Sequence, residues 1–273
     1  MPKGRIVVTG ASGSMGTAAC RELARAGCEV VMACRNLEKA AGVREDILKE
    51  CPGASLELRH VDLSSLASVR AFADGLKAEG VPISGLFNNA GTLNKDYVAT
   101  EDGYEECVQV NCISPLLLCR LLAPEMEPGG HIVNMVSLSD GFARVRDDFF
   151  HRRPEDYSQL GSYAMSKRGL LLGTVSFALE HPDLMVNVSD PGIVDSDMIT
   201  MHRWFDPLTD VIFRPFCNSP ARGAAPALRA LDASCTLRRF SGRSGPGKPI
   251  PPRFLSHPAC EIIARELSSI LEG

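Results

Sequence analysis

The chain has 273 residues, of which 45% are hydrophobic, 23% are charged and 6% are aromatic. This composition is typical of a globular protein and excludes a disordered, collagen-like or coiled-coil chain. The net charge of -4 gives no indication of a nucleic-acid partner, and the basic pairs Arg152-Arg153 and Arg238-Arg239 are interpreted as solvated surface.

Short apolar runs alternate with segments of helical length from the start of the chain to about residue 192. The predicted strands are Ile6–Val8, Glu29–Ala33, Leu56–Leu58, Leu86–Phe87, His131–Val136 and Met185–Val188. The predicted helices start near Met15 or span Leu37–Glu50, Leu66–Glu79, Gly103–Leu122 and Gly161–Glu180.

Regular alternation of strand and helix predicts parallel strands joined by right-handed crossovers. The strands are nearly continuous apolar runs, as expected where helices cover both faces of a sheet. The predicted fold class is therefore α/β, a doubly wound parallel sheet (Rossmann fold) with three α/β/α layers. No linker divides residues 1–273, so a single domain is expected. The alternation breaks at about 194–218 and at about 241–258, and the second segment is a predicted surface loop rich in Gly, Pro and Ser.

The cysteines and the apolar runs bear on the cellular compartment. The ten cysteines form no Cys-x-x-Cys pair, so no metal site or redox dithiol is predicted. Cys28, Cys34, Cys112 and Cys119 lie in apolar context and are expected to be reduced core residues. No signal-peptide pattern is recognised. No apolar run reaches the roughly 18 residues of a membrane helix, since the nearest candidate, Gly169–Leu179, is too short and contains Thr174 and Ser176. We expect a cytoplasmic protein without a transmembrane segment.

A glycine-rich turn follows the first predicted strand and opens the first helix. It reads Thr9-Gly10-Ala11-Ser12-Gly13-Ser14-Met15-Gly16. Glycines here let the backbone approach a pyrophosphate closely, and the helix N-terminus supplies N–H donors. The same pattern fits an ordinary strand-to-helix turn, but its position between strand and helix favours a dinucleotide site.

The second predicted strand ends in Cys34-Arg35-Asn36, without an acidic residue. An Asp or Glu at this point would bind the ribose hydroxyls of NAD and repel a 2′-phosphate. A guanidinium suits a phosphate, so Arg35 favours NADP(H) as the cofactor. The alternative is an ordinary surface arginine.

Of the four tyrosines, only Tyr163 has a lysine four residues later, Lys167. Positions i and i+4 share one face of a helix, which would place the ammonium near the phenol. A free tyrosine has a pKa near 10. A nearby cation lowers that pKa, so the phenol could exchange a proton with a carbonyl oxygen.

Together these features resemble the short-chain dehydrogenase/reductase family. Further motifs occur in that family's order: Asp62-Leu63 after the third strand, Asn88-Asn89-Ala90-Gly91 after the fourth, Asn111, Ser137 after the fifth, and Pro191-Gly192 after the sixth. The details are most similar to the retinol dehydrogenase and protochlorophyllide reductase branch, in Val31–Asn36, Thr100–Glu105, the long interval from Ser137 to Tyr163, Phe240-Ser241 and a final helix at Glu261–Leu271.

The resemblance implies a role for each matching residue. Tyr163 would be the general acid/base, and Lys167 would lower its pKa and hold the nicotinamide ribose. Ser137 would hydrogen-bond the substrate oxygen, and Asn111 would fix a water that links Lys167 to solvent. The cofactor-binding residues would be Gly10, Ser12, Gly13, Ser14, Met15, Gly16, Arg35, Asn36, Asp62, Leu63, Asn89, Ala90, Gly91, Tyr163, Lys167, Pro191, Gly192 and Val194.

Three positions depart from the family's pattern. Ser14 replaces a usual glycine, with glycine shifted to Gly13, which leaves open whether a side chain crowds the pyrophosphate. Cys112-Ile113-Ser114-Pro115 replaces a His-rich stretch after the helix asparagine. Asp190 stands where relatives have a histidine before Pro-Gly. None of the three removes the residues expected to move the hydride and the proton.

The residues after Gly192 usually cover the substrate in this family. Here residues 194–218 are rich in apolar side chains, which suits a lipophilic carbonyl or alcohol such as a retinoid, a steroid, or a fatty or xenobiotic aldehyde or ketone. The same side chains could instead seal the core. Two alternatives remain open, a protochlorophyllide-type double-bond reductase and a non-catalytic NADP-binding sensor or scaffold. Ile193 disfavours the first, because the pigment-reducing enzymes have a cysteine there.

Oligomeric state is left open between a monomer and a homodimer. Many relatives pair through two long helices, which here would be Gly103–Leu122 and Gly161–Glu180.

Overall fold

The computed structural model describes residues 3–146, 148–194, 217–242 and 244–272. Within them the strands are β1 (Arg5–Thr9), β2 (Glu29–Cys34), β3 (Ser55–His60), β4 (Ile83–Asn88), β5 (Met126–Met135), β6 (Met185–Asp190), β7 (Arg238–Ser241) and β8 (Lys248–Pro249). The helices are α1 (Ser14–Arg25), α2 (Leu37–Glu50), α3 (Leu66–Glu79), α4 (Glu106–Val108), α5 (Ser114–Leu122), α6 (Gln159–Glu180), α8 (Pro220–Ala230) and α9 (Ala259–Glu272).

The strands form one sheet in the order β3-β2-β1-β4-β5-β6-β7-β8. Strands β1 to β7 are parallel, and β8 pairs antiparallel with β7. Because β1 lies between β2 and β4, the chain winds outward from β1 in both directions. This reversal opens a crevice at the carboxyl ends of the strands. The predicted doubly wound parallel sheet is confirmed.

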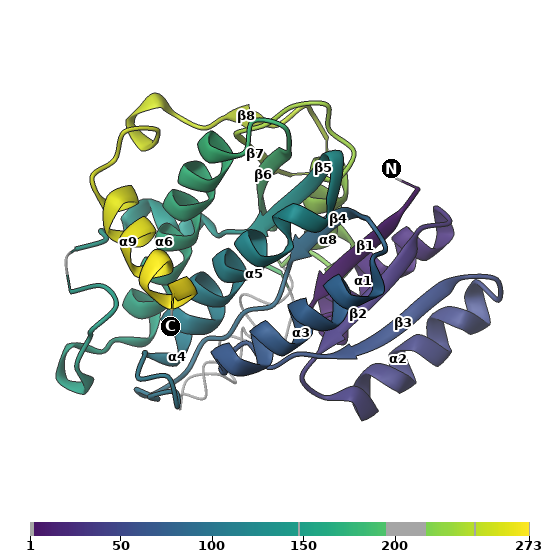
Figure 1. Cartoon of the computed structure of the whole chain (residues 1–273), viewed down its shortest axis with the longest axis horizontal. Helices are drawn as coiled ribbons and strands as arrows, with labels where there is room; N and C mark the ends of the chain where they lie inside the picture. The colour runs from purple at the N-terminus through teal and green to yellow at the C-terminus, as the bar shows by residue number, and fades with distance from the viewer. Residues whose placement is uncertain (1–2, 147, 195–216, 243, 273) are drawn as a thin grey trace.

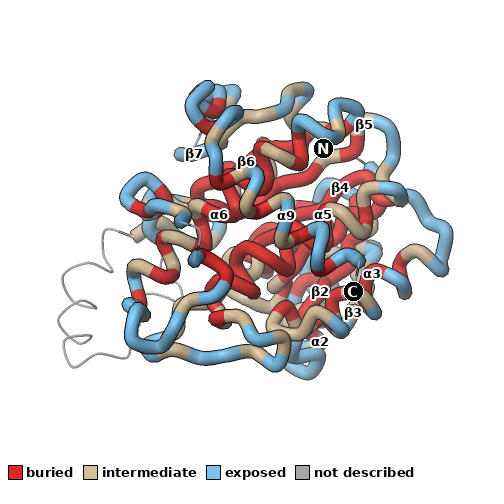
Figure 2. Tube along the Cα trace, turned by 60° about the vertical axis from the view of Figure 1, so that its left-hand side comes forward, coloured by how far each residue is buried: buried red, intermediate tan, exposed pale blue. Residues whose placement is uncertain are grey.

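Helices cover both faces of the sheet, which gives three layers (Figure 1). Side chains of α3, α5, α6 and α9 form one buried apolar cluster. Side chains of α1, α2 and α8 form a second cluster on the opposite face. Figure 2 shows buried residues running along the strands and the inner sides of the helices, with exposed residues in the connecting loops.

Helices α2 and α3 have the predicted bounds, and both begin at a side-chain cap. Asn36 accepts a hydrogen bond from Lys39 N, and Ser65 accepts one from Ser68 N. A polar cap followed by an apolar stripe is a local signal, which is why the sequence predicts these helices well.

The helix predicted over Gly103–Leu122 is instead three consecutive pieces. Glu105 caps α4, accepting from Cys107 N and Val108 N. A π-helical turn, η1 (Gln109–Ile113), then leads into α5. Single π-helical turns are frequent at functional sites, and this one contains Asn111.

Two further expectations about elements are corrected by the structure. Strand β3 is an edge strand whose residues are half-buried or exposed, so it is not buried on both faces. Helix α8 and strands β7 and β8 were not predicted, because Pro220, Gly223 and Pro226 weaken the helical signal and β7 is short and basic. The pair Arg238-Arg239 lies in β7 and is not simply solvated: Arg238 donates to Gly247 O, and Arg239 donates to the buried Asp140.

The structure describes little of the predicted segment at about 194–218 and most of the one at about 241–258. Residues 195–216, most of the expected substrate cover, lie outside the described residues. The chain leaves and re-enters the described part at neighbouring points, because Val194 and Asn218 form a parallel bridge. The expected surface loop at 241–258 is mostly exposed, but it contains β8 and buries Ile250 and Phe254.

One described stretch, Glu106–Glu125, is long and apolar enough to cross a membrane by length and composition. The structure buries 78% of the most apolar part of this stretch inside the fold, as expected for a core helix. Length and composition alone are therefore weak evidence that the stretch spans a membrane.

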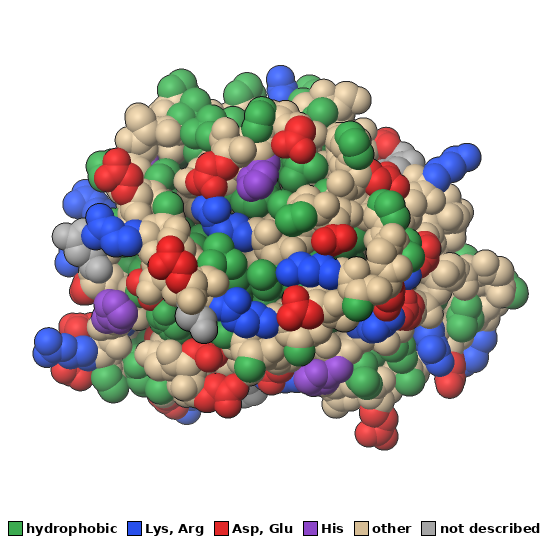
Figure 3. Space-filling model, viewed as in Figure 1, with side chains coloured by type: hydrophobic (Ala, Val, Ile, Leu, Met, Phe, Trp, Pro, Cys, Tyr) green, Lys and Arg blue, Asp and Glu red, His purple; other side chains and the backbone are tan. Residues whose placement is uncertain are grey.

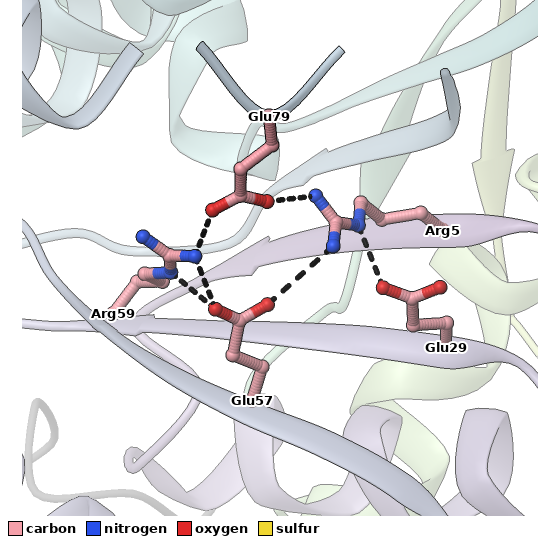
Figure 4. Close-up of polar contacts among 5 residues, drawn as sticks. All are labelled: Arg5, Glu29, Glu57, Arg59 and Glu79. Atoms are coloured by element: carbon pink, nitrogen blue, oxygen red, sulfur yellow. Dashed lines mark hydrogen bonds and ion pairs between the residues drawn. The ribbon is translucent and has the colours of Figure 1, made fainter. Parts of the chain in front are cut away.

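An ion-pair network links the amino-terminal half of the sheet to α3 (Figure 4). The buried Arg5 side chain lies 2.7 Å from Glu29, 3.6 Å from Glu57 and 2.5 Å from Glu79. Arg59 pairs with the same Glu57 and Glu79. Over the face seen in Figure 3, basic and acidic side chains are interspersed without a large patch of either sign.

Candidate active site

A cleft of about 550 Å³ lies at the carboxyl ends of β1 to β4. It gathers all of the cofactor-binding residues predicted in the first half of the chain: Gly10, Ser12, Gly13, Ser14, Met15, Gly16, Arg35, Asn36, Asp62, Leu63, Asn89, Ala90 and Gly91. These residues come from four separate strand ends, and parallel pairing brings the strand ends together.

The glycine-rich turn is built for close backbone approach. Gly10 has φ +63, and a Cβ there would lie 2.9 Å from Ala90 Cα. A Cβ on Gly16 would lie 2.2 Å from the carbonyl oxygen of Gly10, which is backbone and cannot move aside. Ser14 is the exposed first residue of α1, and its neighbour Gly13 has ordinary extended backbone. The turn therefore accommodates Ser14, because its tight contacts fall at positions 10 and 16.

The N-terminus of α1 carries no side-chain cap and has no acidic residue in its first turn. By contrast, α2, α3 and α8 are capped by Asn36, Ser65 and Ser219. The first N–H groups of a helix lack partners within the helix, and the helix dipole favours an anion beside them. The start of α1 therefore offers a donor set that fits a pyrophosphate.

At the far end of the cleft, two cations come from adjacent segments. Arg35 directly follows β2, and Lys39 lies in the first turn of α2. The sequence analysis identified Arg35 and missed Lys39. The sequence feature that could have identified Lys39 is its position four residues after Arg35, in the first helical turn after the cap Asn36. A guanidinium and an ammonium at one place suit a phosphate group.

Asn89 locks the two central strand ends together. Its Nδ2 donates to Thr9 O at 2.9 Å and Gly10 O at 3.2 Å. In return, Thr9 Oγ1 accepts from the backbone N–H groups of Asn89 and Ala90, each at 3.1 Å. Asn89 thus shapes the cleft by holding the glycine turn against the turn after β4.

Tyr163 lines a second cavity, of about 800 Å³. Its apolar wall comes chiefly from the segment between Ser137 and Tyr163 and from the start of α6, a contribution that the sequence analysis did not predict. The apolar side chains are Leu93, Phe142, Ala143, Phe149, Leu160, Ala164 and Met165, and the charged ones are Arg144, Arg146, Arg152, Asp148 and Asp156. The cavity can therefore receive a largely apolar molecule with polar groups.

Tyr163 and Lys167 lie one turn apart on α6, with the Lys167 Nζ 5.8 Å from the centre of the Tyr163 ring. Burial raises the pKa of Tyr163 to about 12, and a hydrogen bond with Ser137 partly opposes that rise. The sequence argument predicted a pKa lowered by Lys167. In this structure the desolvation of the phenol outweighs any such effect, so the phenol is protonated at neutral pH.

Lys167 is buried and donates to Met135 O at the end of β5 at 2.9 Å. Burial lowers the pKa of Lys167 to about 8. Gly91 leaves room for this side chain, since a Cβ at Gly91 would lie 3.4 Å from Lys167 Nζ and 3.1 Å from Asn111 Oδ1. The side chains of Lys167 and Asn111 therefore lie next to Gly91, which lines the cofactor cleft.

Asn111 has hydrogen-bond partners for both its amide oxygen and its amide nitrogen among the described residues. Its Oδ1 accepts from Thr92 N at 2.8 Å, and its Nδ2 donates to Thr92 O at 2.9 Å and to Ser166 Oγ at 3.0 Å. The side chain ties the loop after β4 to α6. Ser166, one residue before Lys167, was missed by the sequence analysis, and its neighbourhood gave no motif that could have identified it.

Pro191, Gly192 and Val194 lie just after β6 and line neither cavity within the described residues. Gly192 has φ +69, a left-handed conformation that favours glycine. Val194 is buried, and its side chain would lie 2.6 Å from a Cβ added to Gly223 of α8.

The four cysteines that were expected in the core lie there. Cys28, Cys34, Cys112 and Cys119 are buried, and the structure joins no pair of the described cysteines in a disulfide. Burial also raises the pKa of Cys112 and Cys119, so neither is a reactive thiolate at neutral pH.

Comparison with known proteins places the chain in a family. The family model described as "short chain dehydrogenase" matches residues 5–204. Human retinol dehydrogenase 13 is 31% identical over 202 residues, which are 72% of this chain and 61% of that protein. Bovine retinol dehydrogenase 12 is 32% identical over 243 residues, covering 87% and 76% of the two chains. Mouse polyprenol dehydrogenase is 33% identical, covering 74% of this chain and 63% of its own.

Among solved structures, a short chain dehydrogenase from Shigella flexneri has a TM-score of 0.68 at 22% identity, covering 91% of this chain and 94% of its own. This likeness supports the fold. The family model and the bovine relative support the lineage. The chain therefore belongs to the short-chain dehydrogenase family of oxidoreductases, and to its retinol dehydrogenase-like branch.

Proposed function

We propose that the protein is an NADP(H)-dependent oxidoreductase that interconverts a lipophilic carbonyl compound and its alcohol, with Tyr163 exchanging the proton. The observation that carries the proposal is the position of Tyr163. Its phenol hydrogen-bonds with Ser137, lies one helical turn from Lys167 and lines an 800 Å³ cavity with an apolar wall.

The chain's own residues fit the cofactor. The uncapped N-terminus of α1 would bind the pyrophosphate, and Arg35 with Lys39 would bind the 2′-phosphate. Asp62 and Leu63 would border the adenine. Gly10 and Gly16 leave backbone surface that any Cβ would obstruct. When bound, the reduced nicotinamide supplies a hydride to the substrate's carbonyl carbon.

The protein's part in the reaction is to hold and protonate the substrate oxygen. Ser137 Oγ would hydrogen-bond that oxygen, and Tyr163 Oη would donate its proton to it as the carbon accepts the hydride. The raised pKa of Tyr163 keeps this proton in place at neutral pH, which suits reduction of a carbonyl. Oxidation of the alcohol reverses the transfer and needs the phenolate, so it should accelerate as the pH rises.

The substrate class follows from the cavity. A wall containing Leu93, Phe149 and Met165 removes apolar surface from water and so favours a lipophilic substrate. The relatives are named for retinol and polyprenol, both lipophilic alcohols. The arginines of the same cavity would face any polar end of the substrate.

The test uses purified protein, NADPH and a panel of lipophilic aldehydes and ketones, with NADPH oxidation followed by absorbance. We expect Tyr163→Phe to lower kcat at least about 100-fold, since it removes the general acid, while the Kd for NADPH changes less than about threefold. Tyr97→Phe is the matched control, because Tyr97 lines neither cavity within the described residues. Undiminished turnover in Tyr163→Phe would refute the proposed role. NADPH binding without turnover of any carbonyl would favour the sensor alternative.

A further inference from the structure

A short segment after β4, Thr92–Asn94, borders both cavities of the active site. Thr92 and Asn94 line the cofactor cleft, whereas Leu93 between them lines the 800 Å³ cavity that contains Tyr163. The segment directly follows Gly91, which also lines the cleft. The position of these three residues therefore shapes the cofactor cleft and part of the wall that a substrate would meet.

Three hydrogen bonds meet at Asn94. Its Nδ2 donates to Glu106 Oε2 of α4 at 2.5 Å, and its Oδ1 accepts from Thr92 Oγ1 at 3.0 Å. Its backbone oxygen accepts from Tyr157 Oη, also at 2.5 Å. Thr92 is itself held, because its backbone N–H and C=O both bond to the side chain of Asn111. The segment is therefore fastened at both of its ends.

Tyr157 links this segment to the rest of the cavity wall. It lies directly before α6, in the interval from which most of that wall comes, and its neighbours Asp156 and Ser158 line the cavity. Tyr157 itself lines neither cavity within the described residues. Burial raises the pKa of Tyr157, so its hydroxyl is protonated at neutral pH and can donate. Its hydrogen bond therefore joins the wall around Leu93 to the wall that precedes α6.

The contact between Asn94 and Glu106 pairs an amide with a carboxylate beside the cofactor cleft. An ionised carboxylate can only accept hydrogen bonds, whereas an amide offers both a donor and an acceptor. The contact therefore needs an amide on one of the two residues, and two carboxylates at the same place would repel each other.

We propose that Tyr157, Asn94 and Glu106 are positioning residues of the substrate site, which hold Leu93 and the adjoining cavity wall in place beside the cofactor cleft. The inference rests on the proposed function of this site. A wall that is already ordered costs less conformational entropy when a substrate binds than one that binding must order. Loosening the wall should therefore raise KM more than it lowers kcat, because the residues that exchange the proton are unchanged.

Removal of one hydroxyl tests the Tyr157 contact. With NADPH saturating, Tyr157→Phe should raise KM for a lipophilic aldehyde about tenfold, while kcat and the Kd for NADPH stay within about threefold. Tyr104→Phe is the matched control, since Tyr104 is also half-buried, donates to Glu266 Oε1 at 2.5 Å and lines neither cavity within the described residues. A parental KM in Tyr157→Phe, or an equal rise in Tyr104→Phe, would overturn the proposal.

Exchange of the donor and the acceptor tests the Asn94 contact. Asn94→Asp places a second carboxylate against Glu106 and should raise KM at least as much as Tyr157→Phe does. Adding Glu106→Gln to Asn94→Asp restores a donor and an acceptor at the same place, so KM should return to within about threefold of the parental value. A double variant that is no better than Asn94→Asp alone would contradict the proposal.

A third readout does not require turnover. Amide hydrogen exchange of the peptide that contains residues 92–97, followed by mass spectrometry, reports whether the segment is held. Exchange should be faster in Tyr157→Phe and in Asn94→Asp than in the parent protein and in the double variant. If the parent reduces no carbonyl, the proposed function fails, and the exchange rates alone decide the holding role. Faster exchange then supports it, and unchanged exchange overturns it.

Discussion

Arg35 and Lys39 show how far single residues can be interpreted from sequence. The absence of an acid at the end of β2 made Arg35 a prediction about the cofactor, and the structure adds Lys39 at the same end of the cleft. Helix α2 begins at Leu37, so its first turn carries Lys39 toward the cleft that Arg35 lines. The pair therefore offers two positive charges where a 2′-phosphate would lie.

Cofactor choice is the prediction at this scale. Arg35→Asp should weaken NADPH binding by about 100-fold or more, since it replaces an attraction with a repulsion, and should leave NADH binding within about threefold. Lys39→Gln should act in the same direction by about tenfold. Fluorescence titration measures both Kd values. Lys49→Gln, on the same helix but paired with Asp46 outside the cleft, is the control. Equal losses for NADPH and NADH would contradict the phosphate assignment.

For Tyr163 and Lys167, the sequence predicted the relative position of the two side chains but not the pKa of the phenol. Their spacing predicted that they share a helix face, and they do. Spacing could not predict the direction of the pKa change of Tyr163, because desolvation depends on how the whole fold buries the phenol. The Ser137 hydrogen bond also comes from a residue distant in sequence.

At the scale of elements, Arg5 of β1 connects three neighbouring elements through ion pairs. Its guanidinium reaches carboxylates on β2, β3 and α3 (Figure 4). Nothing in the local sequence around Arg5 indicates this, since the partners lie 24, 52 and 74 positions away and meet only through parallel pairing. The hydrogen bond with Arg5 is the main cause of the lowered pKa of Glu79.

Removing these ion pairs should lower stability. Arg5→Met leaves three carboxylates without their shared cation, and we expect the free energy of unfolding to fall by about 2 kcal/mol at pH 7. The pKa of Glu79 is lowered in the fold, so its contribution exists above the unfolded value and is lost as the pH falls through the folded value. The difference from the parent should therefore shrink below about pH 4.

Urea unfolding at several pH values measures this difference. The matched control is Arg25→Met, whose side chain is 50% exposed and pairs on the surface with Glu22 of α1 and Glu50 of α2. We expect a loss of less than about 0.5 kcal/mol there. A similar loss in both variants would show that the Arg5 network is no stronger than an ordinary surface pair.

At the scale of the whole molecule, α9 closes the outer side of the helices that many relatives use for pairing. Ile263 of α9 is fully buried. It packs with Leu116 of α5 against Gly173 of α6, where the absence of a side chain makes room for both. A Cβ added to Gly173 would lie 2.2 Å from Leu116 Cδ1. Cys260 Sγ also approaches Leu172 O at 3.6 Å. The C-terminal helix thus occupies part of the surface that a four-helix interface would need.

A monomer is the expected state for that reason. Light scattering coupled to size exclusion should give the mass of one chain. Ile263→Asp buries a charge against α6 and should lower the free energy of unfolding by about 3 kcal/mol or more. Glu261→Ala, an exposed change on the same helix, should have almost no effect. A stable dimer in the parent protein would contradict the argument.

The sequence by itself determined the alternation of strands and helices, the bounds of α2 and α3, the glycine turn and most of the residues that line the 550 Å³ cleft. These follow from local periodicity and from the rule that parallel strand ends meet at one edge. Only the tertiary structure decided the protonation of Tyr163, the partners of Asn111 and Lys167, the cavity wall between Ser137 and Tyr163, and the hydrogen bonds of Asn94. Each of these depends on burial and on contacts between segments far apart in the chain, and electrostatic free energy is set by those surroundings rather than by the residue itself.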